Sequence, residues 1–317
     1  MRVIRELAGL AGERGPLELA AGFFDGVHRG HQRVILEAVQ RARAAGGTAW
    51  VLTLDPHPLQ VLQPAAAPPL LTSLAHKLDL IGQLGAAGVV VLPFTRALAD
   101  EEAEDFIRRL RAALPTPAGL VVGANWTFGH AGRGHADLLQ RLAPRLALQL
   151  TVMEPVYWSG APISSTRIRE QLGRGHLEAA ACMFGRFPSV RGVVEPGRQV
   201  GRRLGFPTAN LRPPDELLPP PGVYATYALL DGVRRFGAAF RPPAPADDLL
   251  EVHFLDVDVA LYGREVEVSF LTRLRDDRRF DTSAALRAQI ARDVADIRRL
   301  TAAYVAPQGE LRPPCPE

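Results

Sequence analysis

Apolar and polar positions follow two different patterns along the chain, and the pattern changes near residues 184–189. Before that point, short apolar runs suited to buried strands alternate with segments whose apolar residues recur at helical spacing. The runs predicted as strands are Leu17–Gly22, Ala49–Leu54, Val89–Leu92, Leu120–Val122 and Leu148–Val152. Helices are predicted over Gln32–Ala45, and over Asp100–Ala113 with Asp100 as the N-cap. This alternation predicts an α/β domain with a parallel sheet wrapped by helices.

After the change, strand-like runs follow one another without helices between them. Alternation is clear in Glu265–Leu271, where every second residue is apolar at the start of the run. The other predicted strands are Val190–Val194, Val223–Leu230, Val233–Phe240 and Val252–Val257, and proline pairs separate several of them. Short strands in succession predict an antiparallel β-barrel. One long helix is predicted after a Thr282-Ser283 start, followed by a loose C-terminal tail.

A length of 317 residues suits two domains, predicted as 1–185 and 186–317. The apolar fraction of 47% excludes a disordered chain, and no apolar run reaches the roughly 18–20 residues that span a bilayer. The N-terminus lacks the layout of a signal peptide. The only cysteines, Cys182 and Cys315, exclude a disulfide framework and a cysteine-rich zinc module. We therefore expect a cytoplasmic protein with no membrane partner.

The net charge of +3 and the pI near 9.2 come almost entirely from arginine, because Lys77 is the only lysine. Acidic residues are interspersed with the arginines, a pattern typical of a solvated surface rather than of a nucleic-acid site. The single lysine also excludes a Walker A loop and a protein-kinase site, since Lys77 stands in neither sequence setting. We expect no nucleic-acid partner.

Candidate chemistry begins where the first predicted strand runs into a helix, because ligands bind at the carboxyl ends of parallel strands. His28 and His31 stand there with Gly30 between them. A helix N-terminus offers free N–H groups to a phosphate, and Gly30 would let the backbone approach it. Two imidazoles at this place can donate hydrogen bonds to an α-phosphate during nucleotidyl transfer. The alternative is a pair of ordinary structural histidines.

A second cluster follows the last strand of the first half. Its hydroxyl and guanidinium groups belong to Ser164, Ser165, Thr166, Arg167 and Arg169. At a helix start such groups can clamp a triphosphate. A simple helix cap is the alternative, and both functions can coexist.

The barrel half carries a glycine-rich turn, GRRLGFPTAN, over residues 201–210. Thr208 and Asn210 place a hydroxyl and an amide oxygen side by side, which suits a hard cation such as Mg²⁺ shared with phosphates. An ordinary Asn/Thr turn is the alternative.

Together these motifs resemble those of the bacterial bifunctional riboflavin kinase/FMN adenylyltransferase (FAD synthetase) family. GFFDGVHRGHQ, LDPHP, LTSLAHKLDLI, VVGANWTFG and ISSTRIRE occur in the family's order, and GRRLGFPTANL, PGVYA, EVHFLDVD, LYG and FLTRLRDDRRFD follow. The resemblance covers about residues 17–298. It implies a Rossmann-like nucleotidyltransferase domain followed by a riboflavin-kinase β-barrel.

The resemblance also implies roles for individual residues. His28 and His31 would stabilise the ATP α-phosphate, and Arg169 with the hydroxyl cluster would hold the part of the triphosphate that leaves as pyrophosphate. Glu251 would be the base that takes the proton of the riboflavin 5′-hydroxyl, although a solvent-facing strand glutamate is the alternative. Thr208 and Asn210 would hold Mg²⁺ with ATP. The remaining predicted binding residues are Phe24, Asp25, Gly26, Gly30, Asn125, Ser164, Ser165, Thr166, Arg167, Gly201, Gly205, Pro207 and Arg275.

This chain departs from the family's pattern in four places. Trp126 replaces a phenylalanine, His135 stands where Asp or Asn is common, and Asp277 replaces a glutamate. A stretch before the predicted base is shortened to Gly237–Pro243.

The function implied is synthesis of FMN from riboflavin and ATP, and then of FAD from FMN and ATP. Two other functions are compatible with parts of this pattern. Related folds with the two-histidine motif adenylylate phosphopantetheine or nicotinamide mononucleotide, but those enzymes lack the PTAN segment with a downstream EVH. A flavin-binding regulator without activity is the other alternative, and a turnover assay separates it from the enzymes.

Overall fold

A six-stranded parallel sheet is the centre of the first of two compact units, which contains residues 1–69 and 74–164. The structure is a computed structural model that describes residues 1–197, 200–213, 216–243, 249–257, 261–304, 311, 313 and 315. The strand order is β1-β4-β3-β2-β5-β6. The strands are β1 Arg2–Ile4, β2 Leu17–Ala21, β3 Thr48–Asp55, β4 Gly88–Pro93, β5 Ala118–Gly123 and β6 Gln149–Met153.

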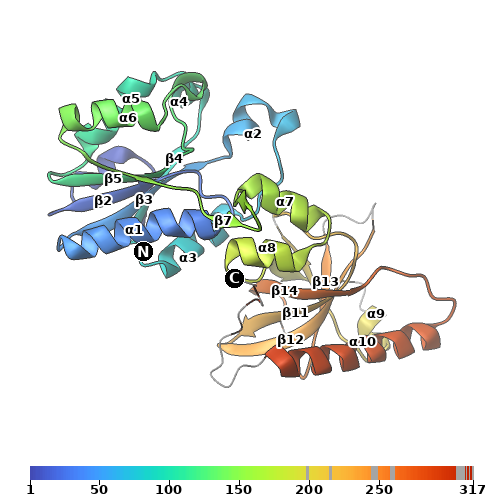
Figure 1. Cartoon of the computed structure of the whole chain (residues 1–317). Coiled ribbons are helices and arrows are strands. Elements are labelled where there is room, and N and C mark those ends of the chain that lie inside the picture. The colour runs from blue at the N-terminus through green and yellow to red at the C-terminus, as the bar shows by residue number, and fades with distance from the viewer. Residues whose placement is uncertain are drawn as a thin grey trace. The chain divides into compact units, whose positions relative to one another are not determined.

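Helices cover both faces of this sheet (Figure 1), with α1 and α3 on one side and α5 and α6 on the other. The helices are α1 Arg29–Ala44, α2 Pro58–Leu62, α3 Leu74–Gln83, α4 Arg96–Ala99, α5 Ala103–Ala113 and α6 Ala136–Leu142. Successive strand residues point to opposite faces, so Leu19 packs in the α5/α6 cluster and Ala20 in the α1/α3 cluster. A short hairpin, β7 Tyr157–Trp158 and β8 Ala161–Pro162, follows the sheet.

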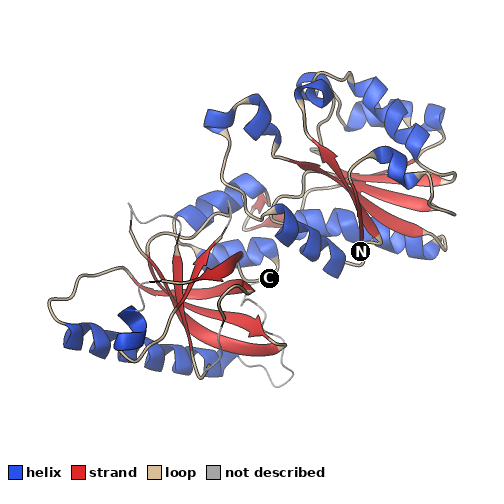
Figure 2. Cartoon of the chain, turned by 180° about the vertical axis from the view of Figure 1, so that it is seen from behind, coloured by secondary structure: helices blue, strands red, loops and turns tan. Residues whose placement is uncertain are grey.

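The second unit contains residues 70–73 and 165–317 and is built on a closed antiparallel barrel of order β10-β13-β12-β11-β14-β9. The strands are β9 Ser189–Glu195, β10 Ala209–Arg212, β11 Gly222–Leu230, β12 Val233–Arg241, β13 Leu250–Phe254 and β14 Glu265–Arg275. The helices are α7 Ser165–Gly173, α8 Leu177–Phe184, α9 Val200–Arg203 and α10 Ser283–Tyr304. Helix α10 lies along the outside of the barrel (Figure 2) and buries Ile297 completely.

One buried carboxylate explains why the short segment Leu70–Ser73 belongs to the second unit. Glu216 is only 5% exposed, and its two oxygens accept hydrogen bonds from the backbone N–H groups of Ser73 (2.7 Å) and Arg191 (2.9 Å). The N–H of Leu217 also donates to the carbonyl oxygen of Leu70 at 2.8 Å. This carboxylate pins the segment just before α3 to the start of the barrel.

The sequence predictions of a parallel α/β part, an antiparallel barrel and a terminal helix are confirmed. The predicted start of that helix is also confirmed: α10 begins at Ser283, and Thr282 Oγ1 accepts a hydrogen bond from the N–H of Ala285 at 3.1 Å. The prediction of Asp100 as an N-cap is wrong. Asp100 ends the short helix α4, and α5 begins after Glu102 without a side-chain cap.

The prediction of a loose tail is wrong for Leu311 and Cys315, two of the tail residues that the structure describes. Leu311 packs against the cluster formed by Ile297 and its neighbours, and Cys315 forms a disulfide with Cys182 on α8. The two Cα atoms lie 5.3 Å apart, a separation typical of disulfides. Apolar burial and this covalent bond return the end of the chain to the barrel unit.

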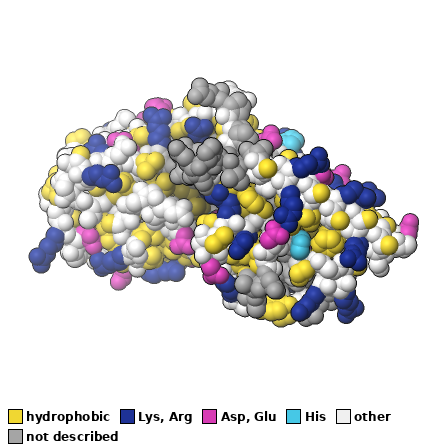
Figure 3. All heavy atoms as spheres, turned by 90° about the horizontal axis from the view of Figure 1, so that it is seen from below, with side chains coloured by type: hydrophobic (Ala, Val, Ile, Leu, Met, Phe, Trp, Pro, Cys, Tyr) yellow, Lys and Arg dark blue, Asp and Glu magenta, His cyan; other side chains and the backbone are white. Residues whose placement is uncertain are grey.

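Basic and acidic side chains are interspersed over the face shown in Figure 3. In the barrel unit, exposed ion pairs join Arg264 with Asp231 and Arg298 with Asp256. Within the residues that the structure describes, no helix has the length and apolarity required to cross a membrane.

Candidate active sites

The loop between β2 and α1 carries the two-histidine motif at the carboxyl edge of the parallel sheet. Its backbone is tightly wound, because Phe24 (φ 56°), Gly26 (φ 79°) and Val27 (φ 40°) all have positive φ. For non-glycine residues this conformation is rare and costs free energy, and it occurs preferentially at functional sites. Phe24, Asp25, Gly26 and Val27 are buried, so the surrounding protein maintains the conformation.

His28 is the N-cap residue of α1, a position usually taken by Ser, Thr, Asp or Asn. Its Nδ1 accepts a hydrogen bond from the backbone N–H of His31 at 3.3 Å. An accepting Nδ1 has no proton, so the neutral ring carries its proton on Nε2 and can donate from there. His28 is 5% exposed and its ring stacks on that of His31 with centroids 3.5 Å apart. The fold thus pairs the two imidazoles.

Gly30 is required here by the first imidazole rather than by its own backbone angle. A Cβ at residue 30 would lie 3.1 Å from Cε1 and 3.2 Å from Nδ1 of His28. Any larger residue would therefore crowd the ring that caps α1. Gly30 therefore leaves room for the ring of His28. This is in addition to the role predicted from the sequence, which is to let the backbone approach a phosphate.

An apolar cavity of about 260 Å³ lies beside this loop in the first unit. Its walls come from the end of β3 and from segments around residues 94–106 and 126–132. Trp126 lines it and stacks on Phe128 with ring centroids 4.6 Å apart. The lining residues are Gly22, Leu52, Leu54, Pro58, Leu62, Phe94, Leu98, Ala99, Phe106, Trp126, Thr127, Phe128, Gly129, Ala131 and Gly132. Such a cavity suits a flat aromatic ligand.

Asn125 follows β5 at the same edge of the sheet and is exposed, next to Trp126. The residues predicted to clamp a triphosphate lie at the start of α7 and just before it. Ser164 is the last residue of the first unit, while Ser165, Thr166, Arg167 and Arg169 lie in the first turn and a half of α7 in the second. Within α7, Ile168 is completely buried and anchors the helix.

The glycine-rich segment of the barrel unit forms a turn that closes on Gly201. The carbonyl oxygen of Gly201 accepts hydrogen bonds from the N–H groups of Leu204 (3.0 Å) and Phe206 (2.8 Å). A Cβ at residue 201 would lie 3.3 Å from Thr208 Oγ1 and 2.4 Å from the carbonyl oxygen of Phe206. Gly205 has φ 87°, which favours glycine. This turn, together with Pro207, presents Thr208 just before β10 begins.

Strand pairing in the barrel brings the predicted metal-binding and base residues together. Asn210 on β10 lies directly opposite Glu251 on β13. Opposite residues of antiparallel strands project from the same face of the sheet. Their neighbours Leu211 and Leu250 are completely buried on the other face, so Asn210 and Glu251 face the outside of the barrel. An amide oxygen and a carboxylate thus share one small region.

Two features hold this region in shape. The loop after β9 packs tightly on Asn210, since a Cβ at Gly197 would lie 2.1 Å from Nδ2 of Asn210. His253, two residues after Glu251, has Nδ1 2.8 Å from the carbonyl oxygen of Pro207. Because a carbonyl oxygen only accepts, Nδ1 of His253 carries the proton and donates. The strand that carries Glu251 therefore also holds the PTAN turn.

The shortened stretch Gly237–Pro243 begins in β12, the strand on the other side of β13, and Phe240 lies opposite Glu251. Despite the shortening, β12 therefore pairs with β13 from Gly237 to Phe240, the residue opposite the candidate base. Residues 244–248, which follow the stretch, lie outside the described residues.

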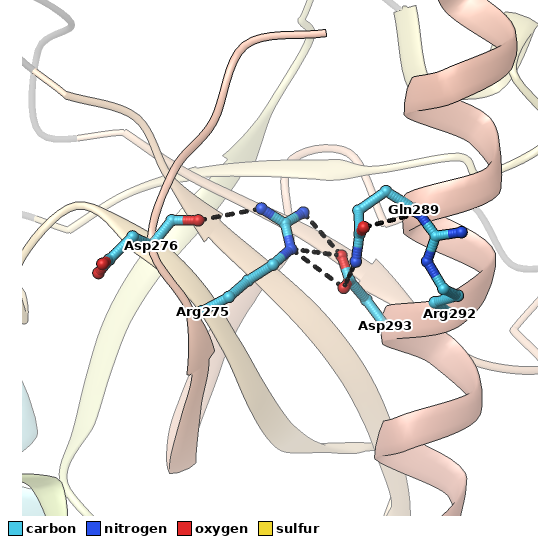
Figure 4. Close-up of polar contacts among 5 residues, drawn as sticks. All are labelled: Arg275, Asp276, Gln289, Arg292 and Asp293. Carbon is cyan, nitrogen blue, oxygen red and sulfur yellow. Dashed lines mark hydrogen bonds and ion pairs between the residues drawn. The ribbon is translucent and has the colours of Figure 1, made fainter.

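Arg275, predicted to bind substrate or nucleotide, is the anchor of the terminal helix (Figure 4). Its Nε lies 3.0 Å and its NH2 group 2.7 Å from oxygens of Asp293 on α10, and NH1 donates to the carbonyl oxygen of Asp276. Asp293 is 4% exposed and also accepts from Nε2 of Gln289 at 2.8 Å. This fork-shaped pair between a half-buried guanidinium and a buried carboxylate fixes α10 against the end of β14.

Sequence reasoning did not assign three residues that the structure places at these sites. Trp126 was noted only as a departure, yet it forms a wall of the cavity. His253 could have been found from its spacing, because residues two apart on a strand share a face with Glu251. Lys77 was excluded from two phosphate-binding motifs, but it lies beneath the two-histidine loop.

Comparisons with known proteins agree with both halves of this description. A family model described as FAD synthetase matches residues 13–167, and one described as riboflavin kinase matches residues 184–301. Bifunctional riboflavin kinase/FMN adenylyltransferase of Escherichia coli K12 is 34% identical over 303 residues, covering 92% of this chain and 96% of the relative. That of Pseudomonas fluorescens is 33% identical, covering 95% and 98%. The crystal structure of a Streptococcus pneumoniae protein named as a macrolide-efflux protein matches with a TM-score of 0.83 at 26% identity, covering 94% and 99% of the two chains.

Proposed function

The chain belongs to the bifunctional riboflavin kinase/FMN adenylyltransferase family, and we propose how its two candidate sites divide the two reactions. The protein is an enzyme that phosphorylates riboflavin with ATP to give FMN. It also transfers the adenylyl group of ATP to FMN, giving FAD and pyrophosphate. We assign adenylyl transfer to residues 1–185 and phosphorylation to residues 186–317. Helices α7 and α8 belong to the barrel unit, although all of α7 and all but the last residue of α8 precede the riboflavin-kinase match.

In adenylyl transfer, a phosphate oxygen of FMN attacks the α-phosphorus of ATP and pyrophosphate leaves. Negative charge builds on the α-phosphate oxygens during this step. Nε2 of His28 is the protonated nitrogen, because Nδ1 caps α1, so it can donate to one of these oxygens. His31, stacked on it, supplies a second imidazole. The N–H groups and hydroxyls at the start of α7, with Arg169, would bind the leaving pyrophosphate.

The apolar cavity beside the loop supports an assignment for the flavin ring. Trp126, Phe128 and Phe106 offer aromatic surface to a flat ligand, and the cavity contacts Gly22 at the root of the two-histidine loop. A flavin ring bound there would have its phosphate tail near the histidines. Asn125, next to Trp126, would orient the ligand at the cavity mouth.

In the kinase reaction, the riboflavin 5′-hydroxyl attacks the γ-phosphorus of ATP, FMN forms and ADP leaves. Phosphoryl transfer depends mainly on positioning and on neutralising charge, and a carboxylate can accept the hydroxyl proton. Glu251 is suited to this role, because it lies opposite Asn210 on the outer face of the barrel. The glycine-rich turn would cover the nucleotide, and His253 would keep that turn in place.

Enzymes that use ATP in these reactions generally need a divalent metal ion, and we propose Mg²⁺ held by Thr208 and Asn210. The hydroxyl and amide oxygens of these residues are the hard, neutral ligands that Mg²⁺ accepts alongside phosphate oxygens and water. When bound, the ion would neutralise charge on the β- and γ-phosphates. The packing of Asn210 against Gly197 and of Thr208 against Gly201 pre-arranges these two oxygens.

The observation that carries this assignment is the register that sets Asn210 opposite Glu251, in a chain that also has His28 capping α1. The test is incubation of purified protein with riboflavin, ATP and Mg²⁺, followed by chromatographic separation of flavins. We expect both FMN and FAD. Formation of neither product, with oxidised or with reduced flavin, would contradict the activity; conversion of added FMN to FAD without riboflavin phosphorylation would contradict the kinase site alone.

A further inference from the structure

The only lysine of this chain is buried beneath the loop that carries His28 and His31. All 36 other basic residues of the Lys/Arg class are arginines. Lys77 lies on α3 and is 4% exposed. Lysine is rarely buried this completely, because removing an ammonium group from water costs free energy. A position that keeps a buried ammonium in a chain rich in arginine therefore calls for a specific reason.

Three oxygen atoms surround the ammonium nitrogen. Nζ of Lys77 lies 3.2 Å from the carbonyl oxygen of Phe23, 3.2 Å from Thr53 Oγ1 and 3.4 Å from the carbonyl oxygen of Leu54. The hydroxyl of Thr53 also donates to the Phe23 carbonyl at 2.7 Å. An ammonium group has three donors and no acceptor, so it matches three oxygens in a compact cage. The planar guanidinium of arginine does not.

This cage joins two strand ends that border the candidate site. Phe23 is the second residue after β2, immediately before the positive-φ segment that begins at Phe24. Thr53 and Leu54 lie at the end of β3. The ring of Phe23 adds to the contact, because Nζ lies 4.4 Å from its centroid. Lys77 therefore holds the root of the loop against the neighbouring strand.

Charged groups on the surrounding elements act on the same ammonium. Asp25, in the loop, and Asp55, at the end of β3, favour its charged form, whereas burial has the larger and opposite effect and lowers the pKa of Lys77 to about 8. Asp55 also forms an ion pair with Arg5, whose NH1 lies 3.6 Å from Oδ2 of Asp55. Further titratable groups on the neighbouring elements are His57, whose ring contacts that of Phe23, and His76 and Asp79 on α3 itself.

We propose that Lys77 is a positioning residue for adenylyl transfer, whose charged ammonium holds the backbone at Phe23 so that the loop presents His28 and His31 to the α-phosphate. The inference rests on the proposed function of that loop. Loss of the proton removes one of three donors and the charge that attracts Asp25 and Asp55. The loop root then loses its electrostatic anchor and adenylyl transfer slows. Riboflavin phosphorylation, assigned to the barrel, does not depend on this anchor.

The pH dependence distinguishes positioning from a role in stability, because the two effects have opposite signs. The pKa of Lys77 is about 8 in the folded protein, whereas that of an unperturbed lysine, as in the unfolded chain, is 10.5. Between these values the unfolded chain binds more protons, so the contribution of Lys77 to the free energy of unfolding rises with pH. Adenylyl transfer should instead fall above pH 8. If Lys77 affected only stability, raising the pH above 8 would make the fold more stable and would not reduce the rate of adenylyl transfer.

The experiment measures initial rates of FAD formation from FMN, ATP and Mg²⁺ between pH 6.5 and 9.5, with riboflavin phosphorylation by the same samples as the reference. For the wild type we expect kcat of adenylyl transfer to fall above pH 8, approaching tenfold per pH unit, with KM little changed.

Lys77→Met should lower kcat at pH 7 by roughly 10- to 100-fold, as misplacement of catalytic groups does, and should remove the alkaline fall. Its melting temperature is measured alongside, because methionine removes a buried charge but leaves the oxygens around Nζ without that donor. Lys77→Arg, which stays charged throughout, should recover part of the rate without the alkaline fall.

Leu80→Ala on the same helix is the matched control, because it removes a buried apolar side chain but no donor and no charge from the oxygens around Nζ of Lys77. It should lower the melting temperature and leave the pH profile of adenylyl transfer unchanged in shape. A wild-type kcat that is constant from pH 7 to 9.5 would overturn the proposal without recourse to any variant. So would a Lys77→Met protein with the wild-type rate, or one that retains the alkaline fall. Absence of FAD formation by the wild type at pH 7 would instead contradict the proposed function itself.

Discussion

His28 has different tasks on its two ring nitrogens, and substitutions can remove them one at a time. Nδ1 caps α1 by accepting the His31 N–H at 3.3 Å, which leaves Nε2–H to donate to the α-phosphate. The amide oxygen of asparagine lies close to the position of Nδ1, whereas the amide nitrogen of glutamine reaches close to that of Nε2. His28→Asn should therefore keep the cap without the catalytic donor, His28→Gln should keep the donor without the cap, and His28→Ala should lose both.

The magnitudes follow from the geometry of these bonds. Loss of an N-cap costs about 0.5–2 kcal/mol, and the 3.3 Å length of this bond places its share near 1 kcal/mol. In a unit of this size that corresponds to a fall of roughly 2–4 °C in melting temperature for the Ala and Gln variants. The Asn variant should melt within a degree or so of the wild type, because Asn is among the best capping residues. Removing one donor to developing charge costs about 2.7–4 kcal/mol, so kcat of adenylyl transfer should fall roughly 10²–10³-fold in the Asn and Ala variants.

The assay combines thermal unfolding with separate rates of FMN and FAD formation. Riboflavin phosphorylation should be unchanged in all three variants and serves as the control for concentration and folding. His28→Gln should regain part of the lost rate despite its lower melting temperature. If the Asn variant retained wild-type FAD formation, Nε2 would not be the donor. If the Asn variant melted with the Ala variant, Nδ1 would not be the cap, and the tautomer inferred from it would be wrong as well.

Three further predictions concern other parts of the chain. Glu251→Gln keeps the shape of the base but cannot accept a proton, so riboflavin phosphorylation should fall about 10²–10⁴-fold while FMN is still converted to FAD; unchanged FMN formation would remove Glu251 from the base position. Trp126→Ala removes the ring that stacks on Phe128, and KM for FMN in adenylyl transfer should rise about 3- to 10-fold, whereas an unchanged KM would place the flavin outside the cavity. The Cys182–Cys315 disulfide closes a loop of 133 residues, worth about 5 kcal/mol in a chain-entropy account, so a reductant should lower the melting temperature of the wild type but not of Cys182→Ser.

The local patterns of the chain were sufficient for its two architectures. Runs such as Leu17–Gly22 and the alternation in Glu265–Leu271 are properties of neighbouring residues, and their period reports which face is buried. The observed strands β2 and β14 contain most of these predicted residues. The site around His28 was also accessible, because a strand end and a helix start are adjacent in sequence. Where competing caps were close together, as at Asp100, the same reasoning failed: Thr95 caps α4 instead, its Oγ1 accepting from the N–H of Leu98 at 3.2 Å.

The sequence by itself therefore determined the alternation of elements, the motifs and the family resemblance that they carry. Only the tertiary structure decided which distant residues meet. Asn210 faces Glu251 because of the register between β10 and β13, Lys77 lies under Phe23 because α3 packs beside β2 and β3, and Cys182 meets Cys315 because the tail returns to the barrel. Periodicity records the direction in which a side chain points relative to its neighbours, but not the strand or helix that it reaches. That partner is selected by the packing of whole elements, which no short stretch of sequence contains.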